Sequence, residues 1–279
     1  MFKLKTILTE VLKVSEIYHH GILGMKWGVR RYQNKDGSLT PEGRFRYYKE
    51  SSKQIKTNKD GSKTIPNGFV FNRVGKSSLD INQSGALYVS YGKDDAARYI
   101  KNLGPTPVSK LLKNYGEAVQ HISAKSNLKM ASNSQTAEET ARLLMKNSKM
   151  LDTLNESIYG MVFTNDFETK ITAADIEKAL KNPSGKDGQK LAYCVSSFLG
   201  DPNYADESKI VYEYFRNKGY DAIPDLHDTL SGTSKTAMII INPDKIKVDS
   251  TTIITQDVMK SGKDYVKTLD KLTVSELIK

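Results

Sequence analysis

The stretch from Gly219 to Asp228 gathers the side chains of this chain that are best suited to proton transfer. It places Asp221, Asp225 and Asp228 close to His227 in the sequence. A histidine beside carboxylates can act as a general base, because its pKa lies near neutral pH and a carboxylate can orient its ring. The alternative is that these aspartates only shape turns and that the histidine faces solvent.

The elements around this stretch would hold it in place. A helix is expected to end at Gly219, and the apolar run Met238 to Ile241 predicts a β-branched strand that leads to Asn242-Pro243. Between the acidic segment and this strand lies a polar loop of Ser, Gly and Thr residues. The arrangement predicts a ligand site under a mobile loop.

The composition limits the classes of protein to consider. The chain has 279 residues, a formal net charge of +10, one cysteine and 38% hydrophobic residues. It can bury an ordinary core, and we expect one main domain with appendages.

A lone Cys194 excludes an internal disulfide and a thiolate zinc site. No apolar run is long enough for a spanning helix, so we expect no membrane span. The positive charge favours anionic partners.

The N-terminal region is expected to serve recognition rather than core formation. Residues 1–18 predict an amphipathic helix. Residues 19–62 are basic and punctuated by glycine, and they carry aromatic and arginine side chains of the kind that dominate small interfaces. Docking on a partner is therefore expected of the following side chains: His20, Met25, Trp27, Arg30, Arg31 and Tyr32. Metal binding by His19 and His20 is the less favoured alternative, since neither cysteine nor a nearby third histidine supports it.

Part of this region resembles a short module found in many proteins of tailed phages and prophages of Gram-positive bacteria. The matching residues are His20-Gly21, Gly24-Met25-Lys26-Trp27-Gly28, Arg30-Arg31-Tyr32-Gln33 and Asp36-Gly37-Ser38-Leu39-Thr40-Pro41-Glu42-Gly43. The resemblance implies a phage or prophage origin and association with phage head or other virion proteins. It places the protein in the virion or in the cytoplasm of the host bacterium.

Residues 26–63 hold most of the net charge, with eleven basic and four acidic residues that give +7. Tyr32, Tyr47 and Tyr48 lie among them, which would suit non-specific binding of a nucleic-acid strand through charge and stacking. A solvated, partly disordered linker has the same composition and is the favoured interpretation.

The main domain is expected to span residues 63–255 and to be α+β. Strands are predicted at Gly68 to Gly75 and at Ser84 to Tyr91, and a helix opens at Asp94-Asp95. Helical spacing of apolar residues predicts a large helical insertion over about 107–218. Further strands are expected at 235–241 and 246–254, and residues 256–279 form a weakly amphipathic helical tail.

The ordered set of motifs in this domain resembles the ADP-ribosyltransferase fold in its divergent phage and toxin form. The set runs from Arg73-Val74-Gly75, through Gly85-Ala86-Leu87-Tyr88-Val89-Ser90, to Gly219-Tyr220-Asp221-Ala222-Ile223 and the strand after it. The resemblance implies a small split antiparallel sheet that binds NAD. By position, Arg73 would bind the diphosphate or ribose of NAD. Tyr88 and Ser90 would line the nicotinamide pocket, and Tyr99 would lie behind this pocket.

The chain departs from that family where a glutamate should stabilise the positively charged ribose. It has Ser234-Lys235-Thr236 there, with no carboxylate. Asp225 and Asp228 are the nearest substitutes, and Asp221 is a third candidate. Asp225, Asp228 and Ser90 form the predicted catalytic set. The predicted function is that of a virion-associated enzyme that transfers ADP-ribose from NAD to a host target. The alternatives are a non-catalytic virion component with a degenerate transferase fold and a basic DNA-binding accessory protein.

Overall fold

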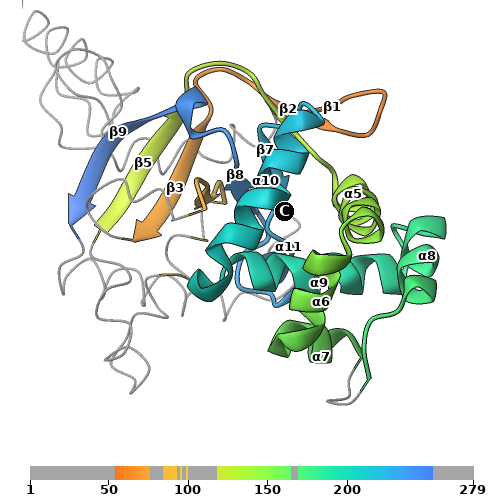
Figure 1. The fold of residues 1–279 in the computed structure, drawn as a ribbon. Helices are drawn as coiled ribbons and strands as arrows, with labels where there is room; N and C mark the ends of the chain where they lie inside the picture. The colour runs from red at the N-terminus through yellow and green to blue at the C-terminus, as the bar shows by residue number, and fades with distance from the viewer. Residues whose placement is uncertain are drawn as a thin grey trace, which may run out of the picture. The chain divides into compact units, whose positions relative to one another are not determined.

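The computed structural model describes residues 54–75, 84–92, 95, 99, 118–164 and 169–253 (Figure 1). All of them belong to one compact unit, Lys49–Lys279. The predicted N-terminal helix, the docking residues from His20 to Tyr32 and the tail 256–279 lie outside the described residues.

The described residues form one nine-stranded sheet with the order β1-β2-β6-β7-β8-β4-β3-β5-β9. The β6–β7 pair is parallel, and every other neighbouring pair is antiparallel. The strands are β1 (Lys56–Thr57), β2 (Lys63–Ile65), β3 (Val70–Gly75), β4 (Leu87–Ser90), β5 (Ala118–Ala124), β6 (Leu128–Met130), β7 (Ala222–Pro224), β8 (Ala237–Ile240) and β9 (Ile246–Ile253). The predicted strands β3, β4, β8 and β9 are confirmed.

Seven α-helices with described bounds follow β6 along the chain, six of them before β7 and one between β7 and β8. They are α5 (Asn133–Lys146), α6 (Ser148–Glu156), α7 (Ile158–Thr164), α8 (Ala173–Lys181), α9 (Lys186–Leu199), α10 (Ala205–Asn217) and α11 (Leu226–Leu230). The helix α8 begins with a capping box of the kind that its sequence Thr172-Ala173-Ala174-Asp175 predicts: the Thr172 hydroxyl accepts from the Asp175 N–H, and the Asp175 carboxylate accepts in return from the Thr172 N–H. The α+β class is thus confirmed.

Two boundaries differ from the sequence-based expectation. The sheet begins at β1, before residue 63, because the basic stretch ends in a hairpin that pairs β1 with β2 and β2 with β6. Its turn contains Gly61 at φ 81, a conformation that glycine adopts freely. Lysines at an exposed sheet edge discourage further strand pairing. The same lysines give this hairpin the composition of a linker, which explains the incorrect boundary.

The region 107–218 is also not helical throughout, because residues 118–124 and 128–130 are β5 and β6. Every residue of β5 is buried. A strand buried on both faces lacks the alternation of polar and apolar residues that marks a half-exposed strand. Among the described residues of this region, the helices begin at α5.

The sheet separates two apolar cores, which define its two faces. On the helical face, Tyr88, Ile223 and Ile239 pack with buried residues of the helices, among them Phe198 and Tyr212. On the opposite face, the core has the following members: Ile65, Phe69, Phe71, Leu87, Val89, Ile122, Ala124, Leu128, Met130, Ala222, Met238, Ile240 and Ile246. Alternate residues of a strand point to opposite faces, so these lists fix the direction of each side chain in the central strands. Cys194 in α9 is fully buried in the helical core.

Candidate active site

The candidate site begins with a row of polar residues across the helical face of the sheet. Ser90 of β4 lies opposite Asn72 of β3, which lies opposite His121 of β5. All three are buried. In the other direction, Ser90 lies opposite Ala237 of β8, whose carbonyl accepts a hydrogen bond from the Asp225 N–H at 3.1 Å. Directly paired residues share a face, so Ser90 and Asp225 lie on the same side of the sheet.

Asp225 ends the row and starts the helix α11. Its carboxylate Oδ1 accepts hydrogen bonds from the Asp228 N–H at 3.2 Å and from Ser196 Oγ of α9 at 3.0 Å. Ser196 Oγ also accepts from the His227 N–H at 3.2 Å. An aspartate at the N-cap holds the first turn of a helix in place. Asp225 is buried, and its position makes it a positioning residue that links β7, α9 and α11.

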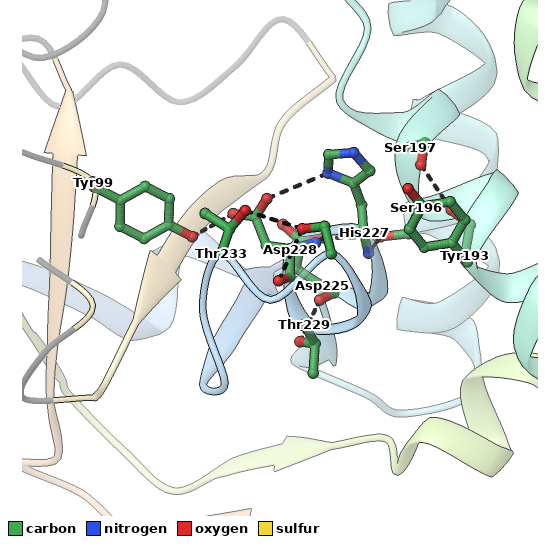
Figure 2. A network of polar contacts seen from close by, with 10 residues as sticks. Tyr99, Tyr193, Ser196, Ser197, Asp225, His227, Asp228, Thr229 and Thr233 are labelled. Carbon is green, nitrogen blue, oxygen red and sulfur yellow. Dashed lines mark hydrogen bonds and ion pairs between the residues drawn. The ribbon is translucent and has the colours of Figure 1, made fainter. Parts of the chain in front are cut away.

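Asp228 lies at the centre of the network, between Tyr99 and His227 (Figure 2). The Tyr99 hydroxyl donates a short hydrogen bond to Asp228 Oδ2, across 129 residues of sequence. The other carboxylate oxygen, Asp228 Oδ1, lies 3.3 Å from His227 Nδ1. The His227 ring stacks on Tyr193 of α9 with a centroid separation of 5.5 Å. Tyr99 and the stacked ring thus orient the carboxylate of Asp228, whose side chain is 21% exposed.

A second carboxylate anchors the polar loop beside this network. Asp95 Oδ2 accepts short hydrogen bonds from the hydroxyls of Ser234 and Thr236. Thr236 Oγ1 in turn accepts from the Gly92 N–H at 2.5 Å and from the Tyr91 N–H at 3.1 Å. A side chain at Gly92 would collide with Asp95 and Thr236. Asp95 is buried and its Oδ2 holds both hydroxyls, so it fixes the loop that follows Asp228.

The environment moves the pKa values of the two site aspartates apart. Burial, followed by the nearby charge of Asp228, raises the pKa of Asp225 to about 6. Burial also raises the pKa of Asp228, but the hydrogen bonds from His227 and Tyr99 outweigh it, and the net pKa is lowered. The hydrogen bond to Asp228 raises the pKa of His227. Pairs of acids whose pKa values diverge are typical of acid–base sites. Near neutral pH the site holds an ionised Asp228 beside a histidine that can give or take a proton.

Four of the sequence-predicted residues lie on the helical face: Ser90, Tyr99, Asp225 and Asp228. Tyr88 shares this face, but its hydroxyl lies 3.1 Å from that of the fully buried Tyr212 and its ring packs in the helical core. Burial, with Tyr212 as the next cause, raises the pKa of Tyr88 well above its usual value. Tyr88 is thus partly buried, and its ring packs against the helical core.

Arg73 is not brought into this group. It follows Asn72 along β3 and therefore points to the opposite face of the sheet. Its Nη1 donates to Gln120 Oε1 of β5 at 3.0 Å, and its guanidinium lies over Gly75. Adjacent residues of a strand point to opposite faces of the sheet. Arg73 therefore does not share the face of Ser90, and the expectation that both bind one ligand is not met.

Asp221 is likewise outside the site, at the other end of β7. Its carboxylate forms an ion pair with Lys245 Nζ at 2.8 Å and accepts from the Lys129 N–H at 3.0 Å and from Asn242 Nδ2 at 3.1 Å. These bonds use the carboxylate to hold β6, β7 and the turn before β9 together. Asp221 is therefore a structural residue and not a third catalytic candidate.

Sequence reasoning missed Asp95, Tyr193 and Ser196. The pair Asp94-Asp95 was interpreted only through its helix dipole, and a serine or tyrosine within a helix carries no local signal of its contacts. Among the described residues, no three His, Cys, Asp or Glu side chains are grouped so that they could hold a metal ion. Within the same residues, no helix has both the length and the apolar character needed to span a membrane.

The raised pKa of Asp225 predicts a specific pH dependence of stability. The folded protein holds this proton more tightly than the unfolded chain, so protonation stabilises the fold fully below pH 3.8 and the contribution is lost as pH rises through 6. We expect the free energy of unfolding of the wild type to fall by up to about 3 kcal/mol over this window relative to Asp225→Asn, which keeps the cap oxygen. Urea unfolding of both proteins at pH 4 and pH 7 measures the difference, and parallel pH profiles would contradict it.

Comparison with known proteins gives one short match. Residues 11–34 match a family described only as one of unknown function (DUF7211). This segment lies outside the described residues and overlaps the predicted docking module. No curated protein and no solved structure matches the chain.

Proposed function

We propose that the domain is an ADP-ribosyltransferase-like enzyme that cleaves NAD at the bond between ribose and nicotinamide, with Asp228 as its catalytic carboxylate. The observation that carries the proposal is the hydrogen bond from Tyr99 to Asp228, beside His227 and on the same face as Ser90. It joins a residue expected to back the nicotinamide pocket with one expected to replace the missing glutamate. The ADP-ribosyltransferase type of sheet remains part of this proposal.

The chemistry assigns a separate task to each polar group. The bond from ribose C1′ to the nicotinamide nitrogen breaks, and nicotinamide leaves with the bonding electrons as a neutral molecule. The ribose carbon then carries positive charge, which the ionised Asp228 stabilises at short range. The acceptor nucleophile bonds to C1′ and loses its proton to neutral His227, whose Nδ1 faces Asp228 and whose Nε2 can accept. Asp225 holds α11 so that both groups keep their positions, and Ser90 contacts the substrate from β4.

This assignment differs from the family pattern in the role of arginine. Arg73 lies on the opposite face and receives no part in binding the diphosphate. Its exchange for lysine would keep the charge while changing the fork geometry. Label transfer is therefore expected to persist in Arg73→Lys, whereas the family pattern would require its loss.

The direct test is incubation of the full chain with NAD labelled in the adenine part, with and without host lysate. Release of nicotinamide and transfer of label to a host macromolecule are the expected results. Release without transfer would restrict the function to hydrolysis. If neither occurs, the remaining functions are the non-catalytic virion component and the DNA-binding accessory protein, because neither needs chemistry at Asp228.

The N-terminal segment is proposed to dock the protein on other virion proteins. The support is that the family match covers residues 11–34 alone and so precedes the residues of the α+β domain in the chain. Deletion of residues 19–44 is expected to remove the protein from purified particles while leaving NAD cleavage intact. Unchanged incorporation would contradict docking, and a steep salt-dependent affinity for DNA would favour the accessory DNA-binding role instead.

A further inference from the structure

Asn72 is a buried polar residue for which the fold alone gives no use. Its side chain lies in the middle of β3 and the residue is 1% exposed. Neither Nδ2 nor Oδ1 of its amide has a hydrogen-bond partner among the described residues. Buried amides without partners cost folding free energy, and most proteins avoid them. Such a group in the middle of a strand therefore points to a ligand that supplies the missing partners.

The direction of Asn72 connects it with the candidate active site. It is paired with Ser90 of β4 and points to the helical face, as Ser90 does. Neighbouring strands are about 4.8 Å apart, which places the amide within reach of a ligand bound at Ser90. Val70 and Val74 flank Asn72 on the same face and are both partly exposed. The amide therefore lies beneath this face, between the two valines.

The chemistry of the amide selects one class of ligand. A carboxamide side chain presents one acceptor oxygen next to a nitrogen with two donors. Its natural complement is a planar edge with a donor beside an acceptor, as in a primary carboxamide or in a nucleobase such as adenine. Ser90 adds a hydroxyl that can either donate or accept. A carboxylate or phosphate, which only accepts, would leave the Asn72 oxygen without a partner.

We propose that Asn72 is a specificity-determining residue that binds the planar amide-type edge of the substrate, next to Ser90. The inference rests on the proposed function, because it concerns the same substrate and the same face of the sheet. It assigns recognition of the flat ring to Asn72, while Asp228 acts on the sugar. Nicotinamide and adenosine are the two sources of such an edge in NAD, and they are tested separately.

The test uses the full chain and the variants Asn72→Val and Asn72→Ala, with Asn155→Ala as the matched control. The Asn155 amide is satisfied, since it accepts from the Ile171 N–H at 2.8 Å and donates to the Ile171 carbonyl at 3.2 Å. Affinity for nicotinamide and for adenosine is measured by calorimetry, and the melting temperature of each variant is measured without ligand.

The expected result is that Asn72→Val and Asn72→Ala lose about tenfold or more in affinity for one of the two compounds, as removal of a paired hydrogen-bonding group does. Asn72→Val should melt at the wild-type temperature or higher, while Asn155→Ala melts lower. The proposal is overturned if the Asn72 variants bind both compounds as the wild type does, if the wild type binds neither, or if Asn72→Val is destabilised as strongly as Asn155→Ala.

These outcomes separate the inference from the proposed function. Binding that depends on Asn72 in a protein that does not cleave NAD would retain the recognition role and remove the transferase. Cleavage of NAD with the same KM in wild type and Asn72→Ala would retain the transferase and remove the recognition role.

Discussion

Asp228→Asn is expected to lower kcat for NAD cleavage by about a hundredfold or more, with little change in melting temperature. The substitution keeps the shape of the side chain and an oxygen for the Tyr99 hydroxyl, but it removes the negative charge that faces the developing positive charge on the ribose. Losing one preorganised electrostatic group of this kind typically costs about 10²- to 10³-fold in kcat. Initial rates of nicotinamide release, measured at saturating NAD, report the loss.

The matched control for this prediction is Asp206→Asn. Asp206 lies in the first turn of α10 with its side chain 90% exposed, and it pairs only with Lys209 among the contacts of the described residues. The same chemical change there should leave kcat at the wild-type value. Equal rates for Asp228→Asn and the wild type would remove Asp228 from the chemistry and would leave its network a purely structural one.

Asp221→Ala is expected to destabilise the domain by about 3 kcal/mol without lowering kcat of the protein that remains folded. The change leaves the Lys129 N–H and the Asn242 amide without their acceptor and breaks the ion pair with the half-buried Lys245. Removing one partner of a buried charged network costs about 3 kcal/mol or more, because the other partners stay desolvated. Equilibrium unfolding in urea measures the free energy.

Asp244→Ala provides the comparison, since Asp244 is an exposed aspartate in the neighbouring 3-10 turn. A surface substitution there should change the unfolding free energy by no more than about 0.5 kcal/mol. Together, Asp221 and Asp228 form a contrasted pair within one short segment. A kcat loss for Asp221→Ala equal to that of Asp228→Asn would mean that the two aspartates do not have separate roles.

Much of the fold could be predicted because its signals are local. The capping box at Thr172 and the β-branched run before Asn242-Pro243 each depend on neighbouring residues, and both correspond to observed elements. The strand β5 lacked such a signal, since all its residues are buried. The hairpin β1–β2 carried a misleading local signal, because its lysines give it the composition of a linker.

Within the candidate site, closeness in sequence indicated Asp225 and Asp228, whereas Ser90 and Tyr99 were indicated only by the family resemblance. Asp225 and Asp228 share the first turn of α11, and their spacing alone indicated a common role. Asp95 meets Thr236 across 141 residues, which no local pattern can indicate. The side of the sheet that Arg73 faces depends on a single position of alternation along β3. A shift of one residue along the strand turns a side chain to the other face of the sheet, and the spacing of the motifs does not determine the face to that precision.

The order of strands also determines when the active site can form during synthesis. β8 lies between β7 and β4, although β4 leaves the ribosome long before β8 does. A nascent chain that ends before residue 237 therefore lacks a central strand of the sheet, and its first strands must wait unpaired on one side. Such long-range pairing is slow and leaves strand edges open to association. The loop that follows Asp228 can therefore be held against Asp95 and β4 only after β8 has been translated, so the candidate site is assembled late from distant segments.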